Sequence, residues 1–272
     1  MARYFEFYGG AADKITGETI PYLNGYTVYT LREPYGVTGH IVPWNYPMQI
    51  IGRTLGAALA MGNACVLKPS EEACLTALAI GDLAIQAGFP KGSINIVPGY
   101  GSESGLSLTQ HPEVRHLSFT GSVEVGKIIQ TEAAKNLVPV TLELGGKNPI
   151  IIFPDADPKQ AANFAVKGMN MNRQGQSCSS TSRVLVHKDL HHEVLKEMKR
   201  LAEDLPVGLP WLEKNELGPI VSEIHYKKIL NYISSAKNEG ADLITGGEIP
   251  KEQELQDSFF FNPLFLTKSQ WT

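Results

Sequence analysis

The chain has 272 residues, 43% of them hydrophobic, and its 24 Lys and Arg against 28 Asp and Glu give a formal net charge of -4. This composition is typical of a globular protein, and the weak negative charge argues against a nucleic-acid-binding protein, which usually has a basic surface. Three cysteines form no disulfide framework and predict a reducing, cytoplasmic setting. The longest apolar stretch, residues 55–67, is shorter than the ~20 residues that a membrane span needs, so we expect no membrane contact.

The first elements in chain order are a helix over residues 1–12 and a strand over 26–30 that lies outside the main sheet. Short apolar, β-branched runs then alternate with helical patterns, at residues 38–42, 64–67, 94–97, 116–119 and 140–142. Strands that alternate with helices predict βαβ units and a parallel sheet. Because the runs are almost continuously apolar, we expect helices to cover both faces of this sheet. The predicted fold class is α/β.

The ends of several helices can also be read from the sequence. Ser70 predicts the N-cap of a helix with two glutamates in its first turn, and Gly88 predicts its end. Asp157, followed by a proline, and Asp189 predict the starts of two further helices. New strand patterns at 150–153, 184–186 and 242–244 predict a second α/β unit after residue 149.

Two glycine-containing turns follow predicted strands and begin predicted helices. Gly101 lies in the first, and Gly121 and Ser122 lie in the second. Glycine lets a backbone approach a phosphate, and a helix N-terminus attracts its charge. Neither turn has the strict G-x-G-x-x-G spacing, so each taken alone is also compatible with an ordinary turn between a strand and a helix.

Three residues are candidates for chemistry. Cys178 has small polar neighbours, which predict the exposure that a reactive thiol needs, whereas Cys65 and Cys74 are predicted to lie in the core. Glu143 lies between two leucines at a strand end, where desolvation would raise its pKa toward that of a general base. The side-chain amide of Asn45 is suited to donate to an oxyanion. The alternatives are a small cysteine in a turn, a solvated glutamate and a turn asparagine.

Metal binding is not expected. His187, His191 and His192 are close in sequence, but no further histidine, cysteine or carboxylate cluster has the spacing of a zinc site.

Five segments together resemble the motifs of the NAD(P)-dependent aldehyde dehydrogenase superfamily, in the same order and at the same spacing: PWNYP at 43–47, KPSE at 68–71, FTGS at 119–122, LELGGK at 142–147 and GQSC at 175–178. The resemblance implies a parallel, Rossmann-like dinucleotide-binding domain over residues 35–146 and part of a catalytic domain over 147–272. It also implies the end of an N-terminal helical segment at 1–15 and half of an oligomerisation arm at 16–34.

The resemblance assigns roles residue by residue. Cys178 would attack the aldehyde, Asn45 and the Cys178 N–H would hold the oxyanion, and Glu143 would activate the water that releases a carboxylic acid. The residues that it places at the cofactor are Trp44, Lys68, Ser70, Glu71, Gly101, Gly121 and Ser122. The carboxylate of Glu71 suits free ribose hydroxyls and repels a 2′-phosphate, so NAD is favoured, with NADP still open. A dimer or tetramer is implied for the complete chain.

The sequence also departs from the family pattern. Met171 stands where an aromatic or branched residue is usual, and Ser180 where Ala or Gly is usual, so the aldehyde preferred stays open. Family members are nearly twice as long and contain a later glutamate that holds the nicotinamide ribose. The abrupt ends, and an apolar run at 259–266 that needs packing partners, predict a part of a longer chain with little dehydrogenase activity of its own. The alternatives are a CoA-acylating relative, against which Glu143 argues, and an inactive, cofactor-binding remnant.

Overall fold

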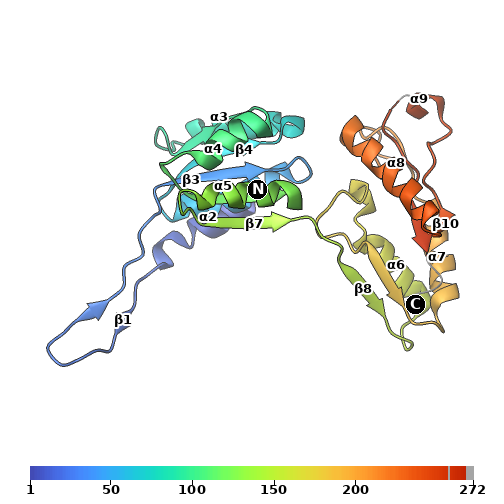
Figure 1. The fold of residues 1–272 in the computed structure, drawn as a ribbon, viewed down its shortest axis with the longest axis horizontal. Coiled ribbons are helices and arrows are strands. Elements are labelled where there is room, and N and C mark those ends of the chain that lie inside the picture. Colours follow the sequence, from blue (N-terminus) through green and yellow to red (C-terminus); the bar gives the residue numbers. More distant parts are fainter. Residues whose placement is uncertain (257, 268–272) are drawn as a thin grey trace. The chain divides into compact units, whose positions relative to one another are not determined.

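The computed structural model describes residues 1–256 and 258–267. The chain divides after Gly145 into two compact units (Figure 1). In the part of the chain that is described, no helix is both long enough and apolar enough to cross a membrane.

A five-stranded parallel sheet forms the centre of the first unit. Its strands are β3 (Val37–Val42), β4 (Ala64–Pro69), β5 (Ile94–Ile96), β6 (Val114–Gly121) and β7 (Val140–Leu144). They lie in the order β5-β4-β3-β6-β7, and all neighbours pair in parallel. These are the five predicted runs, so the prediction of an α/β fold with a parallel sheet is confirmed. From β3 the chain first adds β4 and β5 on one side and then β6 and β7 on the other, so the strand order reverses next to β3. In such sheets, ligands bind beyond the carboxyl ends of the strands at the point of reversal.

Helices cover both faces of this sheet. Along β3, Val42 packs into a buried cluster with Ile51 and Leu67, whereas Ile41 packs against the cluster of Leu117 and Phe119. Neighbouring residues of a strand point to opposite faces, so the two clusters lie on opposite sides of the sheet. The helices of this unit are α1 (Ala2–Gly9), α2 (Pro47–Ala60), α3 (Leu75–Gln86), α4 (Leu106–Gln110) and α5 (Val123–Ala134). Burial on both faces explains the continuous apolar run at residues 64–67 of β4, whereas β7 at the edge of the sheet alternates between half-buried and exposed residues.

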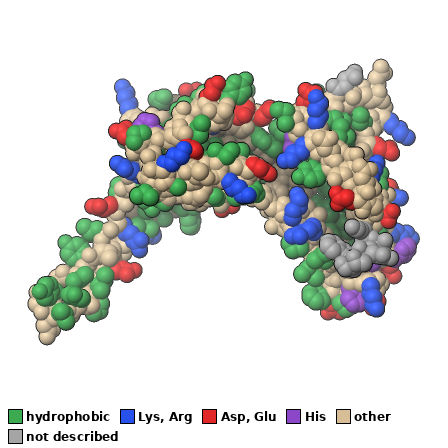
Figure 2. Space-filling view, viewed as in Figure 1, with side chains coloured by type: hydrophobic (Ala, Val, Ile, Leu, Met, Phe, Trp, Pro, Cys, Tyr) green, Lys and Arg blue, Asp and Glu red, His purple; other side chains and the backbone are tan. Residues whose placement is uncertain are grey.

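A hairpin extends away from the sheet between α1 and β3 (Figure 1). It pairs β1 (Thr19–Ile20) with β2 (Val28–Tyr29) in antiparallel fashion, and β2 is shorter than the strand predicted over 26–30. Its apolar side chains are largely exposed (Figure 2): Tyr22, Leu23, Tyr26, Tyr29 and Leu31. An oligomerisation role for this hairpin stays a prediction.

The described residues of the second unit form two separate strand pairs and four α-helices. The strands β8 (Pro149–Ile152) and β9 (Arg183–Val186) pair in parallel, and β10 (Asp242–Thr245) pairs with β11 (Phe265–Thr267) in antiparallel fashion. The helices are α6 (Pro158–Gly168), α7 (His191–Glu203), α8 (Glu223–Asn238) and α9 (Gln253–Gln256). The predicted second α/β unit is thus present, with strands at all three predicted places.

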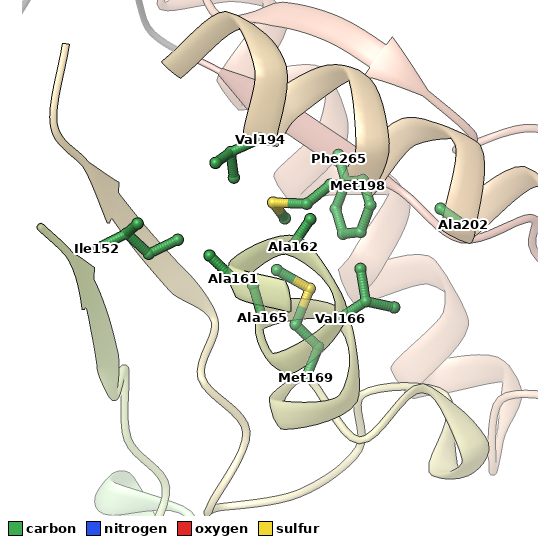
Figure 3. Close-up of a cluster of buried hydrophobic side chains, with 10 residues drawn as sticks. All are labelled: Ile152, Ala161, Ala162, Ala165, Val166, Met169, Val194, Met198, Ala202 and Phe265. Carbon is green, nitrogen blue, oxygen red and sulfur yellow. The ribbon is translucent and has the colours of Figure 1, made fainter. Parts of the chain in front are cut away.

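Helices α6 and α7 pack through the core of this unit (Figure 3). Three alanines of α6, Ala161, Ala162 and Ala165, are buried, and α7 contributes the buried Val194 and Met198. Small side chains on one helix allow the backbone of its neighbour to approach closely, and larger ones on the other helix fill the space.

The apolar run at 259–266 packs within its own unit. Phe260 and Phe265 are buried, and the ring of Tyr226 stacks on Phe261 with 4.4 Å between the ring centroids. Partners for this run are therefore found among the described residues, and the expectation that it lacks them is wrong.

Two predicted helix starts need correction, and one is confirmed. Ser70 caps a short 3-10 turn, η2 (Glu71–Ala73), by accepting from Glu72 N at 3.3 Å, and α3 begins only at Leu75. Asp189 lies in a turn in which its N–H donates to His187 Nδ1, so α7 begins two residues later. Asp157 Oδ1 accepts from Gln160 N at 2.8 Å and caps α6 as predicted. Other short helical turns are η1 (Ala12–Lys14), η3 (Gly101–Gly105) and η4 (Met171–Arg173).

A buried histidine makes the first unit sensitive to acid. His40 in β3 is 3% exposed, its Nε2 lies 2.9 Å from Thr38 Oγ1, and its Nδ1 has no hydrogen-bond partner among the described residues. Burial, with a smaller effect of His116, lowers the pKa of His40 from 6.5 to about 4. Below pH 6.5 the unfolded chain therefore binds the proton that the folded chain excludes, and stability falls until the pH reaches about 4.

The free energy of unfolding should fall as the pH is lowered from about 7 to about 5. We expect this fall to be about 2 kcal/mol smaller in His40→Gln than in the unsubstituted protein. Urea titrations at the two pH values measure this difference. His111→Gln, at an exposed histidine of the same unit, is the matched control. The assignment to His40 is wrong if both variants keep the full pH dependence of the unsubstituted protein.

Candidate active site

Cys178 lies on an exposed turn between η4 and β9, in the second unit. Exposure of this thiol confirms the expectation from its small polar neighbours. The backbone before it is unusual, because Asn170 and Gln174 adopt left-handed conformations with φ of 54° and 55°. Such conformations cost about 1–2 kcal/mol for residues with a side chain and persist where surrounding contacts impose them. The turn is thus held in a specific shape rather than being a generic connection.

The loop that carries Cys178 satisfies most of its own amides. Ser177 N donates to Gly175 O at 2.8 Å, Ser179 N to Ser177 Oγ at 3.3 Å and Ser180 N to Ser177 O at 3.2 Å. Within the described part of the second unit, the N–H of Cys178 donates no hydrogen bond. The one loop amide left available is therefore that of the candidate nucleophile.

The two departures from the family pattern point into the protein. Ser180 is buried, and its hydroxyl donates to Met169 O at 2.9 Å, with Gly175 O at 3.3 Å. Met171 is partly buried and packs against the core shown in Figure 3. In this chain both side chains support the loop from within.

Asn148 contacts the Cys178 loop and was not found by sequence reasoning. Its Nδ2 donates to Cys178 O at 2.7 Å and to Ser180 O at 3.2 Å. The sequence offered one indication of its role, which is its position directly after the LELGGK segment and before Pro149, the first residue of β8.

Glu143 lies inside β7, and its side chain is exposed. The sheet order makes β7 an edge strand, and Glu143 pairs in register with Thr120 of β6. The prediction that burial between leucines desolvates this carboxylate is therefore wrong. Leu142 and Leu144 pack on the core, so the alternation of a strand directs Glu143 to the opposite side.

Asn45 and Trp44 are half-buried residues in the connection from β3 to α2. Pro47 is the first residue of α2, so Asn45 lies just before a helix N-terminus at the carboxyl end of the central strand. Amide donors of side chains and helix termini at this edge favour a negatively charged group.

A buried lysine and a carboxylate follow β4. Lys68 is 3% exposed, and its Nζ lies 3.1 Å from Glu71 Oε2. Desolvation acts to raise the pKa of Glu71, but a hydrogen bond from its own backbone together with the hydrogen bond and charge of Lys68 lowers it overall. An ammonium has three donors, and among the described residues Lys68 donates to Glu71 alone, so donors remain for a further acceptor. Ser70 between them is half-buried and caps η2.

The turn after β6 leads into the N-terminus of α5. Ser122 caps α5 by accepting from Val125 N at 3.2 Å, and the first turn of the helix also contains the acidic Glu124. A Cβ at Gly121 would lie 2.4 Å from the ring of Phe119, so glycine is needed there. At Gly101, which begins η3, a Cβ would meet nothing within 4 Å, so no described neighbour requires glycine.

In the first unit, Asn45, Lys68, Gly121 and Glu143 all lie at or near the carboxyl ends of strands of one parallel sheet. Cys178 and Asn148 belong to the second unit. Among the described residues, no group of three or more histidine, cysteine or acidic side chains is arranged to hold a metal ion.

Known proteins resemble this chain over nearly its whole length. The profile of the aldehyde dehydrogenase family matches residues 1–270. A putative aldehyde dehydrogenase, DhaS, of Bacillus subtilis is 47% identical over 249 residues, which are 92% of this chain and 50% of that protein. The crystal structure of a putative aldehyde dehydrogenase from Burkholderia cenocepacia has a TM-score of 0.92 at 48% identity, covering 97% of this chain and 55% of that one.

A second solved structure is that of betaine aldehyde dehydrogenase from Staphylococcus aureus in complex with NAD+. It has a TM-score of 0.95 at 39% identity, covering 98% of this chain and 53% of that one. The chain spans about half the length of the curated relatives that it matches. The profile match and the identities to full enzymes lead to one conclusion: the chain belongs to the aldehyde dehydrogenase family.

Proposed function

We propose that this chain provides the nucleotide site and the nucleophile of an enzyme that oxidises an aldehyde to a carboxylic acid with NAD+. The observation that carries the proposal is the exposed Cys178, whose carbonyl is held by Asn148 while its own N–H is left without an acceptor in the described second unit. A thiol beside an available amide is suited to attack a carbonyl carbon and to stabilise the oxyanion that forms. Relatives named as a putative aldehyde dehydrogenase and a hydroxyisobutyraldehyde dehydrogenase support the same proposal.

The residues of the first unit fit a dinucleotide. Lys68 and Glu71 offer a donor and an acceptor for ribose hydroxyls, and the α5 N-terminus at Ser122 offers amides for a pyrophosphate. The open space at Gly101 leaves room for an approaching nucleotide, and Gly121 is needed in the turn because the Phe119 ring lies against it. Ser70 and Trp44 border the same strand ends. The structure of a Bacillus cereus aldehyde dehydrogenase in its NAD+ complex, 40% identical to this chain, supports NAD as the group bound.

The chemistry would begin at Cys178. Its thiolate attacks the aldehyde carbon, a carbon–sulfur bond forms, and the carbonyl electron pair moves to oxygen. The Cys178 N–H and the Asn45 amide donate to this oxyanion. NAD+, when bound, supplies the acceptor for the hydride that leaves the carbon. Glu143 then takes a proton from the water that attacks the resulting thioester, and Cys178 leaves as a thiolate.

The test is incubation of the complete protein with NAD+ and a panel of aldehydes, with NADH absorbance and the organic product measured together. Formation of NADH and free acid in equal amounts supports the proposal. A product that forms only when coenzyme A is added, as an acyl-CoA, would assign the chain to a thiol-acylating relative. Absence of NADH with every aldehyde, in a protein that still binds NAD+, would leave a cofactor-binding remnant.

Glu71 is expected to set the preference for NAD+ over NADP+. Its pKa is lowered, so it is negatively charged at neutral pH and repels a 2′-phosphate. Glu71→Gln should therefore tighten NADP+ binding relative to NAD+ by about tenfold, or about 1.4 kcal/mol. Fluorescence titration with both nucleotides measures the ratio. Glu72→Gln makes the same charge change without the Lys68 contact; an equal shift in that control would mean that only the general charge matters.

A further inference from the structure

We propose that Asn148 is a positioning residue for Cys178, whose carbonyl it holds so that the thiol and the N–H of Cys178 are presented in one orientation. The proposal rests on the proposed function, because it assigns how the nucleophile of that reaction is kept in place. Asn148 itself touches neither the thiol nor the N–H in these contacts, and it acts through the backbone.

The amide of Asn148 bridges two peptide groups of the nucleophile loop. Its Nδ2 lies 2.7 Å from Cys178 O and 3.2 Å from Ser180 O. A side-chain amide has two N–H donors, so both bonds can form at once. The distance to Cys178 O is at the lower limit of the range for N–H···O bonds, and the distance to Ser180 O is at the upper limit. Two carbonyls held by one planar group cannot rotate independently.

Asn148 is itself fixed by the strand pair of the second unit. Its carbonyl accepts from Arg183 N at 3.3 Å, and Arg183 Nε donates to Lys147 O at 2.8 Å. It precedes Pro149, and a residue before proline is restricted to extended backbone conformations. The side chain that holds the loop therefore projects from the start of β8, not from a mobile connection.

The opposite side of the loop is tied to the end of α6. Ser180 Oγ donates to Met169 O, directly after the last residue of that helix. Between the two ties, the N–H groups of Ser177, Ser179 and Ser180 bond within the loop. The peptide groups on either side of Cys178 are thus constrained, and the direction of its N–H follows from them. Without the Asn148 tie, the remaining hydrogen bond of the Cys178–Ser179 peptide among the described residues is the longer one, 3.3 Å, from Ser179 N to Ser177 Oγ.

The experiment compares three substitutions in the full chain. Asn148→Asp keeps the shape of the side chain and removes both donors, and Asn148→Ser keeps a single donor and serves if the first variant does not fold. Asn215→Ala is the matched control, because Asn215 Nδ2 makes the same kind of bond, to Leu209 O at 3.1 Å, elsewhere in the second unit.

The first measurement is amide hydrogen exchange of peptides covering residues 176–180, followed by mass spectrometry. We expect exchange to become about tenfold faster in Asn148→Asp and to stay unchanged in Asn215→Ala. The second measurement is steady-state aldehyde oxidation. A misplacement of about 1 Å costs on the order of 10²-fold, so kcat should fall by about that factor while KM for the aldehyde changes little. Asn148→Ser should recover part of kcat.

Each result decides the proposal. Unchanged exchange in the loop of Asn148→Asp overturns it, as does faster exchange with an unchanged kcat. A loss of activity that Asn215→Ala reproduces would show a general structural effect and would also overturn it. If the unsubstituted protein oxidises no aldehyde, the proposed function fails separately, and the exchange measurement still decides whether Asn148 fixes the loop.

Discussion

In the complete protein, Cys178→Ala should abolish aldehyde oxidation, by about 10⁴-fold or more, while leaving NAD+ binding nearly unchanged. The loss is large because no other cysteine is placed to replace the thiol. Cys65 is buried, and desolvation, only partly offset by a hydrogen bond from Thr38, raises the pKa of its thiol to about 11, so it is a poor source of thiolate at neutral pH. NADH formation in steady state measures activity, and nucleotide titration measures binding.

Cys74→Ala is the matched control for this prediction. Cys74 is half-buried just before α3, in the first unit, so its removal should leave turnover within about twofold of the unsubstituted protein. Activity that survives Cys178→Ala but disappears in Cys74→Ala would show that the nucleophile is assigned to the wrong residue.

Glu143→Gln should slow the hydrolysis of the thioester by about 10²–10⁴-fold and leave the first hydride transfer nearly intact. The amide of glutamine still forms hydrogen bonds, but it cannot take a proton from water. Exposure of Glu143 on an edge strand leaves it accessible to solvent water. Rapid-mixing kinetics should show a persistent burst of NADH followed by a much slower steady state.

Glu113→Gln provides the comparison, because Glu113 is exposed just before the amino end of β6, whereas Glu143 lies near the carboxyl end of the neighbouring β7. It should alter neither phase. An equal loss of the burst and the steady state in Glu143→Gln would mean that this carboxylate acts before the thioester forms, for example by accepting the proton of Cys178.

The strands of the sheet were predictable because their composition follows from their surroundings. A strand covered on both faces tends to be apolar at consecutive positions, and β4 shows this pattern over residues 64–67. In β6 the polar Arg115, His116 and Ser118 interrupt the apolar residues, so its signal is weaker. Helix starts were less predictable. Ser70 and Asp189 carry N-cap side chains, but both lie in tight turns that use their hydrogen bonds before the helix begins. Local residue type indicates a cap, whereas the number of residues in the turn is set by packing.

The candidate site also combines features that could be predicted from the sequence with features that could not. Exposure of Cys178 follows from its own neighbours and was predictable. Burial of Glu143 was wrongly predicted because flanking leucines, in a strand, place the residue between them on the other face. The contact from Asn148 joins residues 30 positions apart, and no local pattern announces it. The chemical roles of Cys178, Glu143 and Asn45 remain predictions that the experiments above address.

The hydrogen bond between Ser180 and the end of α6 couples the Cys178 loop to the hydrophobic core of the second unit. The carbonyl that receives the Ser180 hydroxyl belongs to Met169, whose side chain lies in the same core as Ala162 and Met198 (Figure 3). A larger side chain at Ala162 displaces α6 from α7 and carries the carbonyl with it. Under the proposed function, substitutions in the core of the second unit should therefore change turnover although the substituted residues do not contact the aldehyde. A search limited to residues that contact substrate would miss them.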